Sequence, residues 1–196
     1  MVNTGDLETT RSRRSLAWEV YEQLTVGSAL IPPTLAFCFD QEGRTQSQID
    51  DMVRRSSGMA HFLPRRTYEN YLIDVDAISA LLNSNGIQIT PADVKAWIAA
   101  NGQRSEYFGN EVVKKCEEPC WPYVVNAPKM LKDLFFALST DTPLAYDKIK
   151  HSVALTEWLL ANKPDDLREL VDYVVKLLPD GENAKRVLPT AQRCRR

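Results

Sequence analysis

The stretch LAFCFDQEGRT, residues 35–45, joins a short apolar run to an aspartate, a glutamate and a glycine. The run before Asp40 is apolar on both faces, which is typical of a strand in a parallel sheet covered by helices. Asp40 and Glu42 then stand at the carboxyl end of that strand, where open α/β sheets bind their ligands. The stretch predicts either acid groups presented to a ligand or a polar turn in which Asp40 caps the next helix.

The residues that follow predict the rest of a βαβ unit. Residues 44–58 have the pattern of a polar helix with a thin apolar stripe, closed by Gly58. The segment MAHFLP, residues 59–64, is typical of a second strand. Strand, helix and strand in about 30 residues make a βαβ unit, whose crossover is nearly always right-handed.

From about Asp74 onward the pattern is helical, so we predict an α/β fold with a mostly helical C-terminal region. Its boundaries are residues 1–73 for the α/β part and 74–196 for the helical part, which ends in a polar, frayed tail. Helices are expected at 13–25, 74–86, 90–102, 104–116, 126–139, 145–163 and 164–178. Two strands are too few for an independent sheet, which suggests a piece of a larger fold.

Composition narrows the functional classes. Of 196 residues, 44% are apolar and 26% charged, and the net charge is −2, so no global positive field indicates a nucleic-acid partner. No apolar run has the length of a membrane span, and the N-terminus lacks a secretory signal, so we expect a cytoplasmic protein without membrane contact. Cys38 is expected to be a buried small side chain. Cys116 and Cys120 favour reduced thiols over zinc, because no second ligand pair follows.

Asp40, Glu42 and Glu69 are the candidate acids. Residues i and i+2 of an extended strand share a side, so Asp40 and Glu42 could converge on one cation. Mg²⁺ binds one or two carboxylates and fills its shell with water and phosphate oxygens. Two such ions stabilise the attacking and leaving oxygens of phosphodiester cleavage. Glu69 follows the second strand, in PRRTYENYLID.

Arginines and lysines are the candidate phosphate contacts. Arg65 and Arg66 precede Glu69, and forked guanidinium groups suit phosphate. The alternative is a solvated pair of arginines, partnered by Glu69 or Asp74.

The segment YDKIKHS contains Lys148, Lys150 and His151. A lysine of this segment could neutralise a phosphate or a leaving oxygen. The alternative is that these residues form the polar face of an amphipathic helix. His61 is expected to be a strand residue with a satisfied hydrogen bond. The sequence has no phosphate-binding P-loop, no GxSxG motif and no His beside a nucleophilic Cys or Ser, so covalent catalysis is unsupported.

The order of these segments resembles the C-terminal part of the OLD family (overcoming lysogenization defect), ATP-dependent endonucleases with an ABC-type ATPase domain followed by a Toprim nuclease domain. The resemblance covers roughly residues 15–178. It rests on FDQEGRTQSQID, HFLPRRTYENYLIDVDAISALL, MLKDLFFALS and YDKIKHSVALTEWLLANKPDDLREL, of which RRTYENYLID is the most specific.

The resemblance implies a partial Toprim-like sheet whose Asp-x-Asp motif is matched by Asp40 and Glu42, with Mg²⁺ or Mn²⁺ as cofactor. It gives Glu69 a ligand or supporting role, and Lys148 or Lys150 the role of the family lysine. DNA is the implied substrate, an ATPase domain or subunit the implied partner, and a homodimer is left open.

A Toprim domain begins with a strand that carries a glutamate followed by glycine, and by resemblance this strand lies upstream of Met1. We therefore expect a fragment or a split subunit with little or no nuclease activity of its own. The competing hypothesis is a non-catalytic protein-interaction module derived from a Toprim domain.

Overall fold

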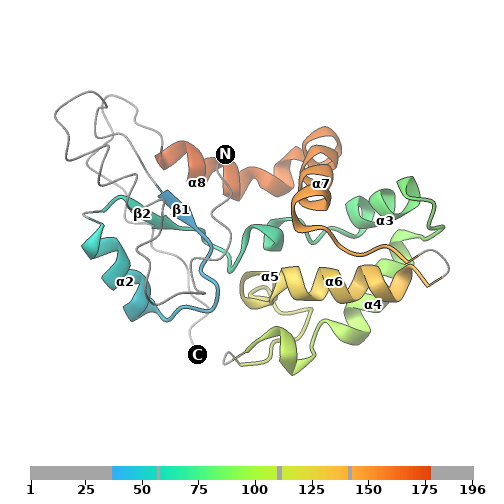
Figure 1. The fold of residues 1–196 in the computed structure, drawn as a ribbon, viewed down its shortest axis with the longest axis horizontal. Coiled ribbons are helices and arrows are strands. Elements are labelled where there is room, and N and C mark those ends of the chain that lie inside the picture. Colours follow the sequence, from blue (N-terminus) through green and yellow to red (C-terminus); the bar gives the residue numbers. More distant parts are fainter. Residues whose placement is uncertain (1–36, 57, 110–111, 141–142, 178–196) are drawn as a thin grey trace. The chain divides into compact units, whose positions relative to one another are not determined.

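Two parallel strands and the helix between them form the predicted βαβ unit (Figure 1). β1 (Phe37–Phe39) pairs with β2 (Ala60–Phe62), and Cys38 lies opposite His61. α2 (Gln46–Arg55) connects the strands and packs against β2. The computed structural model describes residues 37–56, 58–109, 112–140 and 143–177. Within them the fold is a mixture of helices and a small parallel sheet, which agrees with the α/β prediction at that level.

The ends of α2 follow from its sequence. Thr45 caps the helix, and the Gln48 side chain returns the bond by accepting from the Thr45 backbone N–H at 2.8 Å. Ile49 is the buried residue of this polar helix. After the helix Gly58 adopts φ 83° and its N–H donates to the carbonyl of Val53 at 2.9 Å, a left-handed closure that glycine accommodates without strain.

The chain beyond β2 is helical. Its elements are η1 (Tyr68–Tyr71), α3 (Val75–Ser84), α4 (Pro91–Asn101), η2 (Ser105–Tyr107), α5 (Trp121–Val124), α6 (Ala127–Leu138), α7 (Lys148–Asn162), η3 (Pro164–Leu167) and α8 (Arg168–Leu177). The predicted capping residues are confirmed for α3 and α4: Asp74 accepts from the N–H of Ala77, and Thr90 and Asp93 form a capping box around Pro91. The helix expected at 13–25 and the tail lie outside the described residues.

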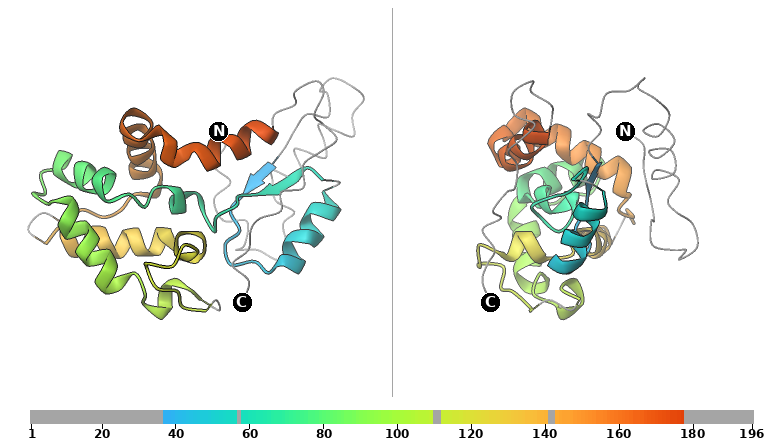
Figure 2. Two further views of the ribbon diagram at one scale, coloured as in Figure 1. Left: turned by 180° about the vertical axis from the view of Figure 1, so that it is seen from behind. Right: turned by 90° about the vertical axis from the view of Figure 1, so that its left-hand side faces the viewer.

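α6 lies at the centre of the apolar core. Its side chains Met130, Leu131, Leu134 and Phe135 are fully buried. α4 packs against α6, while α3 packs against α7 (Figure 2). The same core includes Leu63, Tyr71 and Leu72, which connect the βαβ unit to the helices. The division at residues 73 and 74 stays a prediction.

The helix predicted at 104–116 is wrong. η2 is a single turn, and residues 112–116 are not helical. The carbonyl of Tyr107 accepts the N–H of Asn126 at 2.7 Å instead of a helical partner, and Gly109 adopts φ 61°. Tyr107 and Phe108 are fully buried, so tertiary packing overrides a weak helical preference here.

Two observations concern the cysteines and the membrane. Cys38 is exposed, which corrects the prediction of a buried side chain: among the described residues the sheet has only two strands, so β1 lacks the cover of a central strand. The thiol of Cys116 donates to the carbonyl of Ile98 at 3.4 Å. No helix in the described part of the chain combines the length and apolarity needed to cross a membrane.

Candidate functional site

Asp40 directly follows β1, in a loop that is tied to the chain after β2. The N–H groups of Gln41 and Glu42 both donate to the carbonyl of Arg66, at 2.8 and 3.2 Å. The Gln41 side chain donates to the carbonyls of Leu63 and Pro64. These bonds fix the strand end beside the segment that contains Glu69.

Glu69 lies in η1, which Asn70 holds in place. The Asn70 side chain accepts from the N–H of Thr67 at 2.9 Å and donates to the carbonyls of Pro122 and Val125 at 2.9 and 2.8 Å. Asn70 is buried, and its bonds to Thr67 and Val125 are shielded from water. Glu69 itself is only 1% exposed, and its position is therefore set by the packed helical region rather than by a loose loop.

Lys148 is the first residue of α7 and reaches both acids. Its Nζ lies 3.4 Å from Glu69 Oε1 and 3.8 Å from Asp40 Oδ2. The helix start is fixed by Asp147, whose carboxylate accepts the N–H groups of Ile149 and Lys150. Three residues that are far apart in the sequence thus form one cluster, which we call the Asp40–Glu69–Lys148 cluster.

The electrostatics of the cluster are those of two acids that share one cation. Burial and the neighbouring Glu69 raise the pKa of Asp40 to about 6, and Lys148 and the N–H of Tyr68 oppose this rise. The Tyr68 N–H donates to Asp40 Oδ1 at 2.9 Å. Glu69 Oε2 is buried and has no hydrogen-bond partner among the described residues. A buried carboxylate oxygen without a partner is costly unless a proton or a cation satisfies it.

These features fit a divalent cation. Lys148 stands farther from both carboxylates than the 2.7–2.9 Å of a charge-assisted hydrogen bond, so it only partly satisfies them. Asp40 and Glu69 supply the one or two carboxylates that Mg²⁺ takes from a protein. Among the described residues, no group of three or more His, Cys, Asp or Glu side chains is placed so that it could hold a metal ion.

Glu42 makes no described hydrogen bond or ion pair with this cluster, although its charge is the smallest of the causes that raise the pKa of Asp40. It lies in the turn after β1 with φ 47°. The predicted pairing of Glu42 with Asp40 requires extended backbone, and the backbone is no longer extended at Glu42. Its carboxylate lies 3.3 Å from Nη1 of Arg44, which also donates to the carbonyl of Asp40. A ligand role for Glu42 stays a prediction.

Arg65 points into the protein. Its Nε lies 2.8 Å from Glu169 Oε2, and its Nη1 donates to the carbonyl of Asn70 at 2.9 Å. The guanidinium stacks over the rings of Tyr71 and Tyr123, at 4.4 and 5.1 Å from their centroids. The ionic partner is thus Glu169 on α8, not the nearby Glu69 or Asp74 that a local pairing predicts.

Arg66 also makes internal contacts. Its Nη1 donates to the carbonyls of Val124, Tyr107 and Phe108, at 3.0, 3.3 and 3.4 Å. The carbonyls of Tyr107 and Phe108 belong to the segment that replaces the predicted helix at 104–116, and that of Val124 belongs to α5. A phosphate contact by Arg65 or Arg66 stays a prediction, and their described contacts are structural.

The remaining candidates lie in different surroundings. Lys150 is exposed, whereas His151 is buried and stacks on Phe135 at 5.2 Å between ring centroids. His151 Nδ1 accepts from the N–H of Asp147, and burial lowers the pKa of the imidazole. Burial also lowers the pKa of His61.

Sequence reasoning missed the part of Tyr68 at this site. Its backbone N–H binds Asp40, and its hydroxyl lies 2.7 Å from Thr156 Oγ1, which joins η1 to α7. Every residue except proline has a backbone N–H, so the residue type at position 68 does not predict this bond.

Comparisons with models of protein families, with curated proteins and with solved structures found no match to this chain.

Proposed function

We propose that this chain is the nuclease portion of an OLD-like, ATP-dependent endonuclease with a partial Toprim-like sheet, and that the complete protein hydrolyses DNA phosphodiesters with Mg²⁺ or Mn²⁺. The observation that supports it is the Asp40–Glu69–Lys148 cluster. The sequence resemblance selects Asp40, Glu42, Glu69 and either Lys148 or Lys150 from separate segments. Of the acids, Asp40 and Glu69 each have a carboxylate oxygen within 4 Å of the Lys148 ammonium.

Asp40 and Glu69 would hold the metal ion. The ion, when bound, would polarise a phosphoryl oxygen and activate water. Asp40, with a pKa of about 6, is mostly ionised at pH 7 to 8 and is also able to accept a proton near neutral pH. Lys148 is 58% exposed on a flexible stem, so it can leave the carboxylates and meet a phosphate oxygen.

The first test is metal binding, measured as the loss of the free Mn²⁺ EPR signal on titration of the full chain. We expect binding that Asp40→Asn and Glu69→Gln each weaken at least tenfold. The exposed acid Asp172, on α8, provides a matched control, and Asp172→Asn should bind Mn²⁺ as the unaltered chain does. Equal binding by all four proteins would overturn the metal site.

The second test is plasmid nicking with Mg²⁺ or Mn²⁺. We expect weak or absent cleavage by this chain alone and Mg²⁺-dependent cleavage once the ATPase domain or subunit is supplied. Robust cleavage by the chain alone that Asp40→Ala abolishes would refute the expected weakness while supporting the site. Cleavage that persists unchanged in Asp40→Ala would refute the site.

A second candidate is a non-catalytic interaction module. Its support is an exposed apolar stripe on α7, formed by Ile149, Val153 and Leu160, which share one helical face and are more than half exposed. Absence of Mn²⁺ binding together with concentration-dependent assembly, lost in Val153→Lys, would favour this function over the nuclease.

A further inference from the structure

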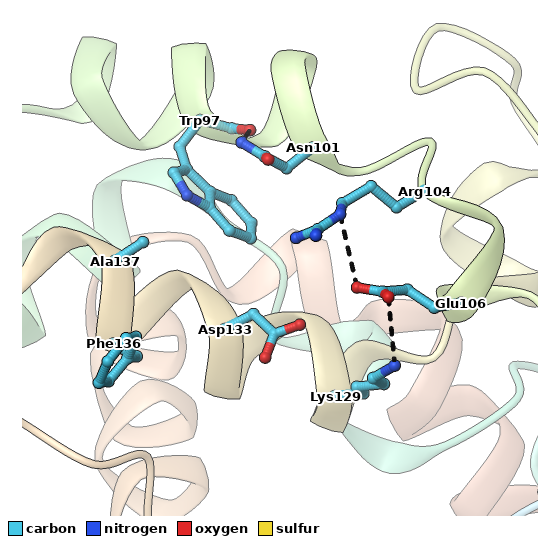
Figure 3. A pocket seen from close by; sticks show the side chains of 8 residues that line it. All are labelled: Trp97, Asn101, Arg104, Glu106, Lys129, Asp133, Phe136 and Ala137. Atoms are coloured by element: carbon cyan, nitrogen blue, oxygen red, sulfur yellow. Dashed lines mark hydrogen bonds and ion pairs between the residues drawn. The ribbon is translucent and has the colours of Figure 1, made fainter.

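A pocket of about 470 Å³ opens between α4, η2 and α6 (Figure 3). None of the residues of the Asp40–Glu69–Lys148 cluster lines it. Its walls combine two aromatic side chains, two cations and two carboxylates. The residues that matter are Trp97, Arg104, Glu106, Lys129, Asp133 and Phe136.

The aromatic side chains offer stacking surfaces. Trp97 is half-buried against the core, and its indole faces the pocket from α4 (Figure 3). Its backbone is held by Asn101, whose side chain donates to the Trp97 carbonyl at 3.0 Å. Phe136, on α6, is 77% exposed. A nucleobase stacks on such rings without regard to its identity.

The ion pairs of the two cations are long, although Arg104 also interacts with the Tyr107 hydroxyl and Lys129 Nζ lies 5.7 Å from the centroid of the Tyr107 ring. Arg104 Nε lies 3.4 Å from one oxygen of Glu106, and Lys129 Nζ lies 3.8 Å from the other. Both distances exceed those of strong ionic hydrogen bonds, and all three side chains are well exposed, so these pairs contribute little to stability. Arg104 and Lys129 are therefore able to turn to a phosphate.

Asp133 provides the edge contact. One of its carboxylate oxygens accepts from the hydroxyl of the buried Tyr107 at 2.8 Å, which fixes the group at the pocket wall. Figure 3 shows this carboxylate pointing into the space that Trp97 and Arg104 also face. A carboxylate accepts hydrogen bonds from the amino groups of bases.

We propose that this pocket binds one nucleotide of single-stranded DNA, with the base on Trp97, its edge toward Asp133 and its phosphate at Arg104 and Lys129. A basic peptide fits less well, because Arg104 and Lys129 repel its cations and Tyr107 occupies one oxygen of Asp133. The inference depends on the proposed function for the choice of DNA, since a nuclease needs to hold the strand that it cuts.

The test uses fluorescence anisotropy of a fluorescein-labelled 12-nucleotide single strand with the full chain in EDTA. The double variant Arg104→Gln/Lys129→Gln should bind roughly tenfold more weakly and lower the salt slope by about 1.4, or about 0.7 per lost phosphate contact. Trp97→Leu should also lose roughly tenfold. Lys95→Gln, an exposed lysine of the same α4 that does not line the pocket, is the control and should change neither value.

Glu106→Gln distinguishes the two ligands. It frees both cations, so DNA binding should tighten, whereas binding of an octa-arginine peptide should weaken. Because Trp97 packs against the core, Phe136→Ala at an exposed ring gives a second aromatic test, with an expected loss of a few-fold. No binding by the unaltered chain, or tighter binding of the peptide that Glu106→Gln abolishes, would overturn the proposal.

Mn²⁺ binding separates this inference from the proposed function. Absence of Mn²⁺ binding by the unaltered chain, beside strand binding in EDTA that depends on the pocket, would refute only the proposed function. Mn²⁺ binding that Asp40→Asn weakens, beside strand binding that ignores Arg104 and Lys129, would refute only the pocket.

Discussion

The βαβ unit and the helical region achieve their structures in different ways. Among the described residues from 37 to 62, Ile49 and Ala60 are the only buried apolar side chains. α6 alone buries Met130, Leu131, Leu134 and Phe135 completely. Hydrophobic burial therefore stabilises the helices, whereas directional hydrogen bonds to the loop after β2 hold the end of β1.

This difference matters because the candidate site lies where the two regions meet. Glu69 and Lys148 belong to the densely packed part, and Asp40 is held to it by the bonds of Gln41 and by the N–H of Tyr68. Asp40 is therefore the member of the cluster whose position is easiest to disturb.

The largest effect is expected in the core. Phe135→Ala should lower the free energy of unfolding by about 3–5 kcal/mol, because the ring is fully buried and a cavity remains. Phe136→Ala, its neighbour on α6, removes an exposed ring and should change stability by about 0.5 kcal/mol or less. Urea unfolding of both variants gives the comparison, and equal losses would contradict the assigned core.

A smaller, pH-dependent effect is expected at Asp40. Its folded pKa of about 6 lies above the unfolded value of about 3.9, so the folded state binds more protons between these values. The unfolding free energy should therefore fall as pH rises from about 4 through 6, by about 3 kcal/mol from this group.

The measurement is urea unfolding at pH 4.5 and 7.5. Asp40→Asn should remove this component and be more stable than the unaltered chain at pH 7.5. Asp172→Asn, at an exposed acid, should keep the full pH dependence. A pH dependence that Asp40→Asn leaves intact would show that Asp40 is not the group responsible.

Next in size is the support of η1. Asn70→Ala removes two donors and leaves the carbonyls of Pro122 and Val125 without them, which should cost about 1–3 kcal/mol. Asn162 makes a single bond of the same kind on the surface, to Trp158, so Asn162→Ala should cost about 0.5 kcal/mol or less. Thermal unfolding compares them, and a harmless Asn70→Ala would mean that the Asn70 side chain does not hold η1 in place.

The elements that the sequence predicts well have local causes. The start of α4 is encoded by Thr90, Pro91 and Asp93, which are neighbours in the chain. The helix predicted at 104–116 fails because the Tyr107 carbonyl pairs with Asn126 and with Arg66, which are distant in the sequence. Helix propensity depends only on the residues of the segment itself. It does not include hydrogen-bond partners from distant parts of the chain.

The same limit applies to the site. The residue types and the resemblance point to Asp40, Glu42, Glu69 and either Lys148 or Lys150. They do not predict that Asp40 and Glu69 both approach Lys148 Nζ within 4 Å, which depends on the packing of α7. Arg65 and Arg66 suit phosphate by type, yet their described contacts are to Glu169, tyrosine rings and backbone carbonyls. A carbonyl is present at every residue, so no sequence pattern distinguishes these bonds.

The smallest expected effect concerns Glu42, which adopts φ 47°. A left-handed conformation costs a residue with a side chain about 1–2 kcal/mol, and glycine avoids this cost but loses about 0.5–1 kcal/mol of unfolded-chain entropy. Glu42→Gly should therefore raise the unfolding free energy by about 0.5 kcal/mol, as measured in urea. Gly43→Ala, at φ 74°, should lower it by about 1 kcal/mol.

The same Glu42→Gly variant decides whether Glu42 binds the metal. If Asp40 and Glu69 hold Mn²⁺ without Glu42, the variant gains stability and keeps its Mn²⁺ affinity. If Glu42 is a ligand, as the Asp-x-Asp resemblance implies, the gain in stability comes with a weaker affinity. The second result would mean that the turn after β1 rearranges when metal binds, because its present carboxylate partner is Arg44. The stability and the Mn²⁺ affinity of this variant thus distinguish two metal sites. In one, Asp40 and Glu69 bind the ion without Glu42. In the other, Glu42 completes the site from the loosely packed end of β1.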